Sequence, residues 1–325
     1  MPLVKTTDML AACRRGQYAV GAFNINGLDQ PAALIAKAEE LGSPLIVVEP
    51  GVIEPYVNFE DFVAVTKRAA EAAGVPVSIH LSHGLDLEQV ERAAKAGFNS
   101  VMYDGSKLPF EENIENTRKA VEIGHRYGAA VEGELGSLGS SFVDITETMT
   151  DPEKAREFVE RTGVDILAVS IGNSHGFYKG TPHLDFDRLA EIREAIAAYP
   201  CYLTLHGGSG ISEEHFKESI KQGITKICIY TEMCSLGRGE IESWLAEHPK
   251  YTGNFDTCDL VKAALTGFTR SEEHCMNMFM SVGRNENLPA ISQAVPENTD
   301  LGPEYPSLVA LNPNFKDTGK FWNEL

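Results

Sequence analysis

The feature that most constrains the fold of this chain is a regular alternation of short apolar runs with amphipathic stretches. The runs are rich in Val and Ile and apolar on both faces, which is typical of strands buried in a parallel sheet. Eight such runs are present, at residues 18–24, 44–49, 76–83, 100–104, 129–135, 166–171, 201–206 and 226–231. The sequence therefore predicts an α/β fold.

The stretches between these runs have the pattern of helices. Leu87, Val90 and Ala94 fall on one stripe, and Asp151 followed by Pro152 is a typical helix start. Eight strand–helix units within roughly 245 residues fit a closed (β/α)8 TIM barrel better than an open sheet. We expect the barrel to span residues 1–250, with a doubly wound open sheet as the alternative.

The remainder, residues 251–325, differs in character. Helices are expected at about 258–282, by their periodicity. After them the sequence is rich in proline and has little periodicity, although it retains Tyr305, Phe315 and Trp322. We expect a C-terminal helical and irregular extension of the same domain, whose tail wraps the surface or a neighbouring subunit; a disordered tail is the alternative.

The charge balance excludes some partners. Lys and Arg number 28 against 47 Asp and Glu, a net charge of −19, which argues against sequence-independent binding to nucleic acid or to anionic membranes. No apolar run reaches the ~18 residues of a membrane span, and residues 1–16 lack a signal-peptide core. The six cysteines form no CxxC pair, so a reduced cytoplasmic protein is expected. An anionic substrate would need a local positive group.

Histidines gather where a barrel carries its chemistry, at the carboxyl ends of strands. Of the nine histidines, His80, His83, His175 and His206 lie at such ends, on three different strands. Three imidazoles with an open fourth position are the arrangement of a catalytic zinc, which polarises a carbonyl oxygen. The alternative is a hydrogen-bonded network without metal.

A glycine-rich loop at residues 207–210 follows the seventh strand and precedes a helix start at Ser212. Backbone N–H groups in such a loop, at a helix N-terminus, can hold an anion. Gly176, Lys179 and Thr231 lie at neighbouring strand ends, where barrels commonly bind phosphate. The alternative is that the loop is only a turn.

Several specific segments run through residues 1–245: GAFN at 21–24, AGFNSVMYDGS at 96–106, VEGELG at 131–136, SHGFYK at 174–179 and LHGGSG at 205–210. Together they resemble the class II, metal-dependent fructose-bisphosphate aldolase family, which includes tagatose-bisphosphate aldolases. The resemblance implies a dimeric or tetrameric TIM barrel that reversibly cleaves a ketose phosphate into dihydroxyacetone phosphate and an aldehyde. Zinc would stabilise the enediolate, through charge stabilisation of the transition state.

The resemblance also assigns residues. It makes His83, His175 and His206 the ligands of Zn²⁺ or another divalent metal, with Glu134 able to reach the metal and Asp104 near an alternative metal position. The residues expected around the substrate and its phosphate are Asn24, Gly176, Lys179, Gly207, Gly208, Ser209, Cys228, Tyr230 and Thr231.

Four positions depart from the family pattern. Ser82 and Phe142 stand where the family has its proton-transferring Asp and Glu, while Cys228 and Tyr230 replace an Asn and an Asp. A serine hydroxyl is a poor acid or base near neutral pH. The candidates for the altered acid–base chemistry are Ser82, Asp144, Glu147 and Glu132. The alternatives are solvated loop charges for Asp144 and Glu147 and a structural hydrogen bond for Glu132.

We therefore expect an aldehyde-lyase of the class II aldolase type, acting on a ketose phosphate or related oxo-sugar with altered acid–base residues. A sugar isomerase or epimerase on the same barrel is one alternative, and a non-catalytic metal-binding barrel is another. Arg270 and Arg284 are candidates for a second phosphate, or else ordinary surface residues. The expected partners are a small-molecule substrate and further copies of the chain.

Overall fold

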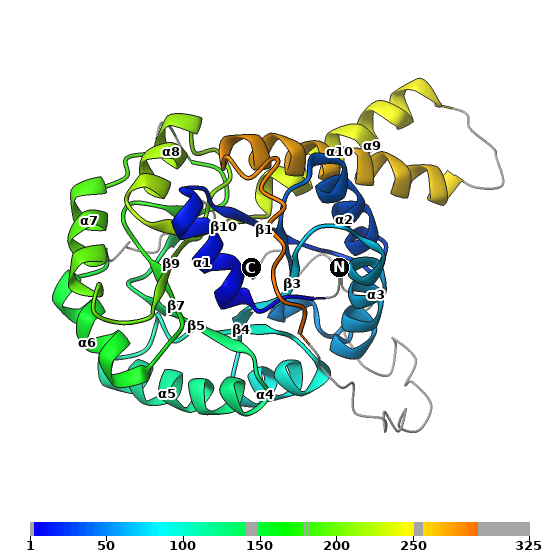
Figure 1. Ribbon diagram of the computed structural model, residues 1–325. Helices are drawn as coiled ribbons and strands as arrows, with labels where there is room; N and C mark the ends of the chain where they lie inside the picture. Colours follow the sequence, from blue (N-terminus) through cyan, green and yellow to red (C-terminus); the bar gives the residue numbers. More distant parts are fainter. Residues whose placement is uncertain (1–2, 141–148, 179, 181, 250–255, 292–325) are drawn as a thin grey trace.

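The chain forms a closed barrel of parallel strands (Figure 1). The computed structural model describes residues 3–140, 149–178, 180, 182–249 and 256–291. The barrel strands, in chain order, are β1 (Val20–Asn24), β2 (Leu45–Pro50), β3 (Val77–Gly84), β4 (Ser100–Tyr103), β5 (Ala130–Leu135), β7 (Ile166–Val169), β9 (Tyr202–Leu205) and β10 (Ile224–Ile229). Strand β1 pairs with both β2 and β10, which closes the barrel. The (β/α)8 TIM barrel is thus confirmed, and the open sheet is excluded.

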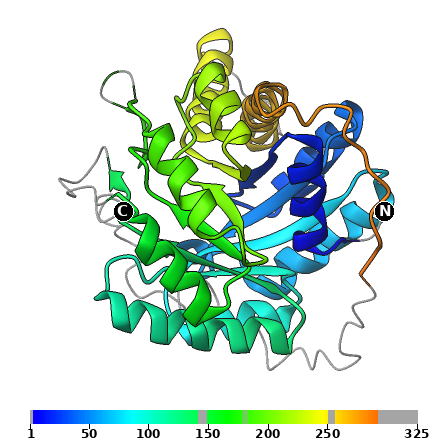
Figure 2. The ribbon, with the colours of Figure 1, turned by 60° about the vertical axis from the view of Figure 1, so that its left-hand side comes forward.

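Helices cover the outside of the barrel, as Figure 2 shows from the side. They are α2 (Gln30–Leu41), α3 (Phe59–Ala72), α4 (Leu87–Ala96), α5 (Phe110–Arg126), α6 (Pro152–Thr162), α7 (Phe186–Ala195) and α8 (Glu213–Lys221), with a 3-10 turn η1 (Gly51–Ile53) after β2. Five of them start at a side chain that accepts a hydrogen bond from a backbone N–H three residues ahead, which stabilises a helix start. These caps are Asn58, Asp86, Asp151, Asp185 and Ser212.

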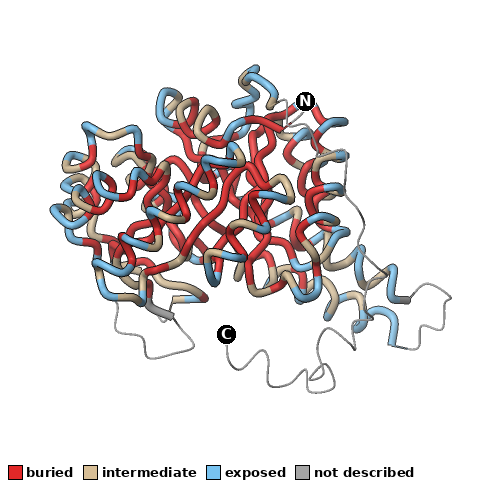
Figure 3. The backbone as a smooth tube through the Cα atoms, turned by 90° about the horizontal axis from the view of Figure 1, so that it is seen from below, coloured by how far each residue is buried: buried red, intermediate tan, exposed pale blue. Residues whose placement is uncertain are grey.

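Successive side chains of each strand point alternately outward and inward, so the buried apolar residues form two clusters. The outward face packs against the helices, where Phe59 and Phe98 meet edge to face with ring centroids 5.1 Å apart. The inward face forms a smaller cluster that includes Val20, Ile46 and Ile166. Figure 3 shows the buried strands inside a shell of helices that are exposed on their outer turns.

Helix α1 (Thr6–Gly16), which the sequence patterns did not predict, lies across one end of the barrel (Figure 1). Its Met9 and Leu10 are fully buried and belong to the same cluster as the inward-facing strand residues. The buried Asn99 ties this end together, because its amide donates to the Val4 carbonyl and accepts from the Ile79 N–H. This amino-terminal end of the barrel is closed by side chains, which leaves the carboxyl ends of the strands for a site.

Two details of the fold differ from the predicted elements: the bounds of the last barrel strand and a small additional sheet. Strand β10 ends at Ile229, Tyr230 leaves the strand with φ −143° and ψ −58°, and Thr231 begins α9 (Thr231–Glu247). A small sheet of β6 (Gly139–Ser140) and β8 (Ser174–His175), which the sequence did not predict, forms outside the barrel.

Helix α10 (Asp256–Met278) packs along α9, and both extend beyond the barrel outline in Figure 1. The contact is close at Gly267, where a Cβ atom would lie 2.4 Å from the Gly237 nitrogen. Helix α10 lies in the region where helices were expected, at about 258–282, by periodicity. The division into barrel and extension stays a prediction, and the tail from residue 292 lies outside the described residues. In the part of the chain that is described, no helix has both the length and the apolar character needed to cross a membrane.

Candidate functional site

Three histidines meet at the open end of the barrel. His83 lies at the end of β3, His175 in β8 and His206 directly after β9. One ring nitrogen of each lies within 4.8 Å of the others, and the His83 ring centroid is 4.9 Å from that of His206 and 5.1 Å from that of His175. The structure therefore brings together the three side chains expected to hold a metal, while His80 lies deeper in the barrel.

Two carboxylates determine which ring nitrogens face the centre of this cluster. Nδ1 of His83 lies 2.9 Å from Oδ2 of Asp104, and Nε2 of His206 lies 2.7 Å from Oε1 of Glu132. A carboxylate accepts hydrogen bonds, so each of these nitrogens carries the hydrogen. The other nitrogens, Nε2 of His83 and Nδ1 of His206, face each other at 3.2 Å, so they share a proton in a hydrogen bond when one ring is protonated and can share a cation when both are neutral.

That separation fits a shared metal ion. Two nitrogens bound to one tetrahedral zinc, each at ~2.0–2.1 Å, lie about 3.3 Å apart. Burial opposes ionisation of His206, but Cys228 and Glu132 raise its pKa well above the usual range, so without a metal a proton lies between the two nitrogens, and a metal ion would replace it. Burial and the neighbouring imidazoles lower the pKa of His175 to about 3, so its ring is neutral, as a metal ligand must be. The donor set suits zinc or another divalent ion that accepts imidazole.

Glu134 of β5 and Asp104, just after β4, complete a second possible ligand group with His83. Within the described residues, Oε2 of Glu134 is buried without a hydrogen-bond partner, and burial together with Asp104 raises the pKa of Glu134 to about 7. Burial opposes ionisation of Asp104 as well, but hydrogen bonds from His83 and Ser106 hold its pKa below the usual range. An unpartnered buried oxygen beside two imidazoles is a further indication of a cation or substrate position.

The backbone at His83 is strained. Its φ of +49° lies in the left-handed region, which is uncommon for residues other than glycine. The residue lies where the pairing of β3 with β4 shifts register, between Leu81 and Gly84, and its N–H donates to Sδ of Met102 at 3.4 Å. Strain of this kind is concentrated at functional sites, where surrounding structure fixes an unfavourable conformation.

The glycine-rich loop at 207–210 lies beside this cluster. It precedes α8 in the chain, and in space it contacts the first turn of α9. Gly207 has a φ of +66°, and a Cβ atom there would lie 2.2 Å from the Ser174 carbonyl oxygen, so only glycine fits. Ser209 Oγ accepts from the Glu232 N–H at 3.0 Å in the first turn of α9, next to Thr231. The Gly208 N–H donates to the Cys228 carbonyl at 3.2 Å and is thereby occupied. The loop meets a helix N-terminus, an arrangement that suits an anion.

The remaining candidates are placed as follows. Cys228 Sγ lies 3.6 Å from Nε2 of His206, and the Tyr230 hydroxyl donates to Oδ1 of Asn26 at 2.7 Å. Asn24 and Ser82 are buried at the ends of β1 and β3, at the same open end, and Gly176 follows β8 with a φ of +87°. Lys179, Phe142, Asp144 and Glu147 lie outside the described residues.

Glu132 is fully buried, and both of its oxygens are engaged. Oε1 meets His206, and Oε2 lies 2.5 Å from Nζ of Lys226 on β10. These contacts favour the structural alternative for Glu132. The sequence analysis missed Lys226, although a charged residue inside an apolar run, two positions before Cys228 and so on the same inward face, was a usable signal.

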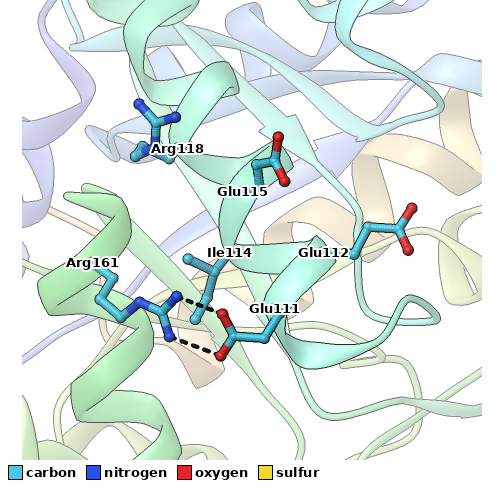
Figure 4. Close-up of a pocket in the computed structure, with 6 residues that line it drawn as sticks. All are labelled: Glu111, Glu112, Ile114, Glu115, Arg118 and Arg161. Carbon is cyan, nitrogen blue, oxygen red and sulfur yellow. Dashed lines mark hydrogen bonds and ion pairs between the residues drawn. The ribbon is translucent and has the colours of Figure 1, made fainter.

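The two arginines expected as candidates for a second phosphate, and one surface hollow, are placed as follows. The Arg270 guanidinium pairs with Glu240 of α9, and Arg284 lies 5.5 Å from the ring centroid of Tyr18, near the closed end of the barrel. A hollow between α5 and α6 (Figure 4) is bounded by an ion pair in which Arg161 bonds both oxygens of Glu111, at 2.9 and 2.6 Å. Its lining contains none of the histidines of the cluster. The lining residues are Glu111, Glu112, Ile114, Glu115, Arg118 and Arg161.

Comparison with known proteins agrees with this arrangement. The sequence model of the family described as fructose-bisphosphate aldolase class-II matches residues 4–284. The solved structure of the YdjI aldolase from Escherichia coli K12 is 34% identical and has a TM-score of 0.76, covering 87% of this chain and 100% of that one. A putative fructose-1,6-biphosphate aldolase from Coccidioides immitis is 29% identical, with a TM-score of 0.77, covering 86% and 98%. A fructose-bisphosphate aldolase from Campylobacter jejuni, at 20% identity and TM-score 0.72, covers 87% and 97% and shows the shared fold.

Proposed function

The chain belongs to the class II fructose-bisphosphate aldolase family, and on that premise we propose that it is a metal-dependent aldehyde-lyase that reversibly cleaves a ketose phosphate or related oxo-sugar. The name of the YdjI structure, an aldolase at 34% identity over its whole length, supports carbon–carbon bond cleavage as the reaction class. The four departures from the family pattern support a substrate or acid–base arrangement that differs from that of fructose-bisphosphate cleavage.

One observation carries the proposal: ring nitrogens of three histidines converge at the open end of the barrel, and two of these rings have their other nitrogen fixed by a buried or half-buried carboxylate. A shared divalent cation accounts for this convergence and would displace the proton between His83 and His206. We assign the cation to His83, His175 and His206, with Glu134 as a carboxylate that can reach it and Asp104 as part of an alternative metal position with His83 and Glu134. A divalent metal bound there supplies a Lewis acid that polarises the substrate carbonyl and stabilises the negative charge developing on it.

The other residues bind and orient. Asp104 and Glu132 hold the imidazoles of His83 and His206 in position through their hydrogen bonds. We assign an anionic phosphate to the loop at 207–210 beside the first turn of α9, where the Ser209 hydroxyl accepts from the Glu232 N–H and can donate its own hydrogen to the anion.

The remaining assignments concern the substrate itself. The Ser82 hydroxyl donates a hydrogen bond to a substrate hydroxyl rather than transferring a proton as a base, since its pKa is far from neutrality. Asn24, Cys228 and Tyr230 line the substrate side, and Asp144 is assigned to proton transfer at the reacting carbon.

The test starts from the full-length protein, stripped of metal with a chelator and then loaded with Zn²⁺. Ketose bisphosphates, ketose monophosphates and unphosphorylated ketoses are incubated with both forms, and released aldehyde and dihydroxyacetone phosphate are trapped enzymatically. Zinc-dependent release of both fragments from one substrate supports the proposal. Interconversion of sugars without fragments would instead identify an isomerase or epimerase, and tight zinc binding without turnover a binding protein.

A pair of histidine variants makes the test specific. His83→Ala removes a proposed ligand and is expected to abolish zinc binding and zinc-dependent turnover together. His125→Ala is the matched control, because Nε2 of His125 also bonds a carboxylate, Asp165 at 2.8 Å, but on the exposed surface of α5. Loss of zinc in both variants, or in neither, would contradict the assignment.

The cellular location, the oligomeric state and the partners are proposed from the family and the composition. A cytoplasmic homo-oligomer, dimer or tetramer, fits the family, and the acidic charge balance disfavours nucleic acid as a partner. Light scattering of the purified chain measures the oligomeric state directly.

A further inference from the structure

A row of buried polar side chains crosses the interior of the barrel beneath the three histidines. Lys226 on β10 and Glu132 on β5 are both 0% exposed, with Nζ and Oε2 2.5 Å apart. A buried ion pair contributes little net stability, because removing both charges from water offsets their attraction. A lysine retained at the centre of an apolar barrel therefore calls for another role.

The hydrogens in this row can be assigned from chemistry. The Lys226 ammonium is a donor only, so Nε2 of His80, 2.9 Å from Nζ, must accept. The Nδ1–H of His80 then donates to Oγ of Ser100 at 2.8 Å. His80 is thus a neutral imidazole held at both nitrogens, and its Nε2 accepts from the Lys226 ammonium beside Glu132, whose Oε2 lies 3.8 Å from that nitrogen.

The hydrogen on His206 can be assigned from its contact with Glu132. With Oε2 of Glu132 held by the ammonium, Oε1 faces Nε2 of His206 at 2.7 Å. The other group near Nε2, the Cys228 thiol at 3.6 Å, is a longer and weaker contact. The carboxylate therefore keeps the hydrogen of His206 on Nε2 and leaves Nδ1 directed at His83, 3.2 Å away.

We propose that Lys226 is a positioning residue for the metal site, which fixes Glu132 and through it the ring orientation and tautomer of His206. Lys226 acts through Glu132, because its ammonium bonds His80 and Glu132, and Glu132 in turn bonds His206. The inference rests on the proposed function, because it assumes that His206 is a metal ligand. Partners that orient metal-bound histidines typically change metal affinity ~10–100-fold when they are removed.

The experiment measures metal binding rather than turnover. Zn²⁺ affinity of the full-length wild type and of Lys226→Met is determined by competition with a chromogenic chelator, and the Co²⁺-loaded proteins are compared by their visible absorption. We expect Lys226→Met to bind zinc ~10–100-fold more weakly, as for other orienting partners, and to show altered Co²⁺ bands because His206 is no longer fixed. Far-UV and near-UV circular dichroism of the metal-free proteins report on folding.

Two further variants keep the test decisive. Lys226→Met leaves Glu132 without its cation, so Glu132→Gln/Lys226→Met removes both charges together and is expected to lose zinc affinity as well. Ser78→Ala is the control: Ser78 is a buried polar residue on β3 whose Oγ lies 2.7 Å from Thr6 Oγ1, at the closed end of the barrel. Its zinc affinity and Co²⁺ spectrum are expected to match the wild type.

The outcomes distinguish a failure of the proposed metal site from a failure of the positioning role of Lys226. If the wild type binds neither Zn²⁺ nor Co²⁺, the metal site is wrong and this inference is overturned with it. If the wild type binds zinc and the folded double variant has the same affinity and spectrum, the positioning role of Lys226 alone is overturned. A loss equal to that of Ser78→Ala would likewise overturn it, since it would reflect a general response to buried polar substitutions.

Discussion

Glu49, near the end of β2, is a carboxyl whose replacement should stabilise the protein. Its side chain is 0% exposed, and neither oxygen has a hydrogen-bond partner among the described residues. Burial, and then the charges of Glu54 and Glu60, raise its pKa from 4.5 to about 9. Glu49→Gln keeps the shape of the protonated side chain but cannot ionise.

The magnitude follows from linkage between protonation and folding. The folded state holds the Glu49 proton more tightly than the unfolded state, so the contribution of this group is present below pH 4.5 and is lost as the pH rises toward 9. At about 1.4 kcal/mol per pKa unit, the wild type loses about 1 kcal/mol from this group by pH 5 and about 4–5 kcal/mol by pH 8. The stability advantage of Glu49→Gln should thus grow by about 4 kcal/mol between pH 5 and pH 8, as an upper value.

The assay is urea unfolding of wild type and Glu49→Gln at pH 5, 6, 7 and 8, followed by circular dichroism. Glu191→Gln, which changes an exposed carboxylate on α7, is the control and should track the wild type at every pH. A difference between Glu49→Gln and wild type that stays constant within about 1 kcal/mol across this range would refute the reasoning, because no differential protonation would then exist.

Three further outcomes are expected. Ser82→Asp should raise cleavage of fructose bisphosphate about tenfold or more from a low base, measured by coupled detection of dihydroxyacetone phosphate, since a positioned acid–base group contributes at least that much; no change would show that another replaced position limits the rate. Asp104→Ala, which removes the partner of Nδ1 of His83, should weaken zinc binding ~10–100-fold in a chelator competition, and an unchanged affinity would contradict the assigned tautomer. Asn99→Ala should lower the urea-unfolding free energy by about 2–4 kcal/mol, because it leaves the buried Val4 carbonyl and the Ile79 N–H unsatisfied; a loss below about 0.5 kcal/mol would contradict that reason.

Much of the fold could be predicted because the strands of a barrel are buried on both faces. Apolar runs such as 44–49 and 166–171 therefore stand out from the amphipathic helices between them. Helix α1 was missed although its buried residues Thr6, Met9, Leu10 and Cys13 have helical spacing. The segment is short, has no side-chain cap, and covers the end of the barrel instead of lying between two strands.

The histidines of the candidate site could be predicted because they lie at strand ends. The residues buried deeper in the barrel, beneath the histidines, could not be placed from the sequence. His83, His175 and His206 meet because parallel strands bring their carboxyl ends to one opening. Lys226 was overlooked because a lysine in a sequence is ordinarily a surface residue, although its place two residues before Cys228 indicated the inward face. The contact with Glu132 could not be predicted, because it joins inward-facing side chains of β10 and β5, which are not neighbours in the barrel.

The helix that closes the barrel has a kinetic consequence. With α1 and the inward-facing side chains filling the amino-terminal end, a ligand of the three histidines approaches them from the opposite opening. A substrate bound there through a phosphate at the glycine-rich loop would be split into one fragment nearer the opening and one still held at the loop. Steady-state product inhibition should then follow an ordered pattern, in which the fragment nearer the opening leaves first and the fragment held at the glycine-rich loop leaves last.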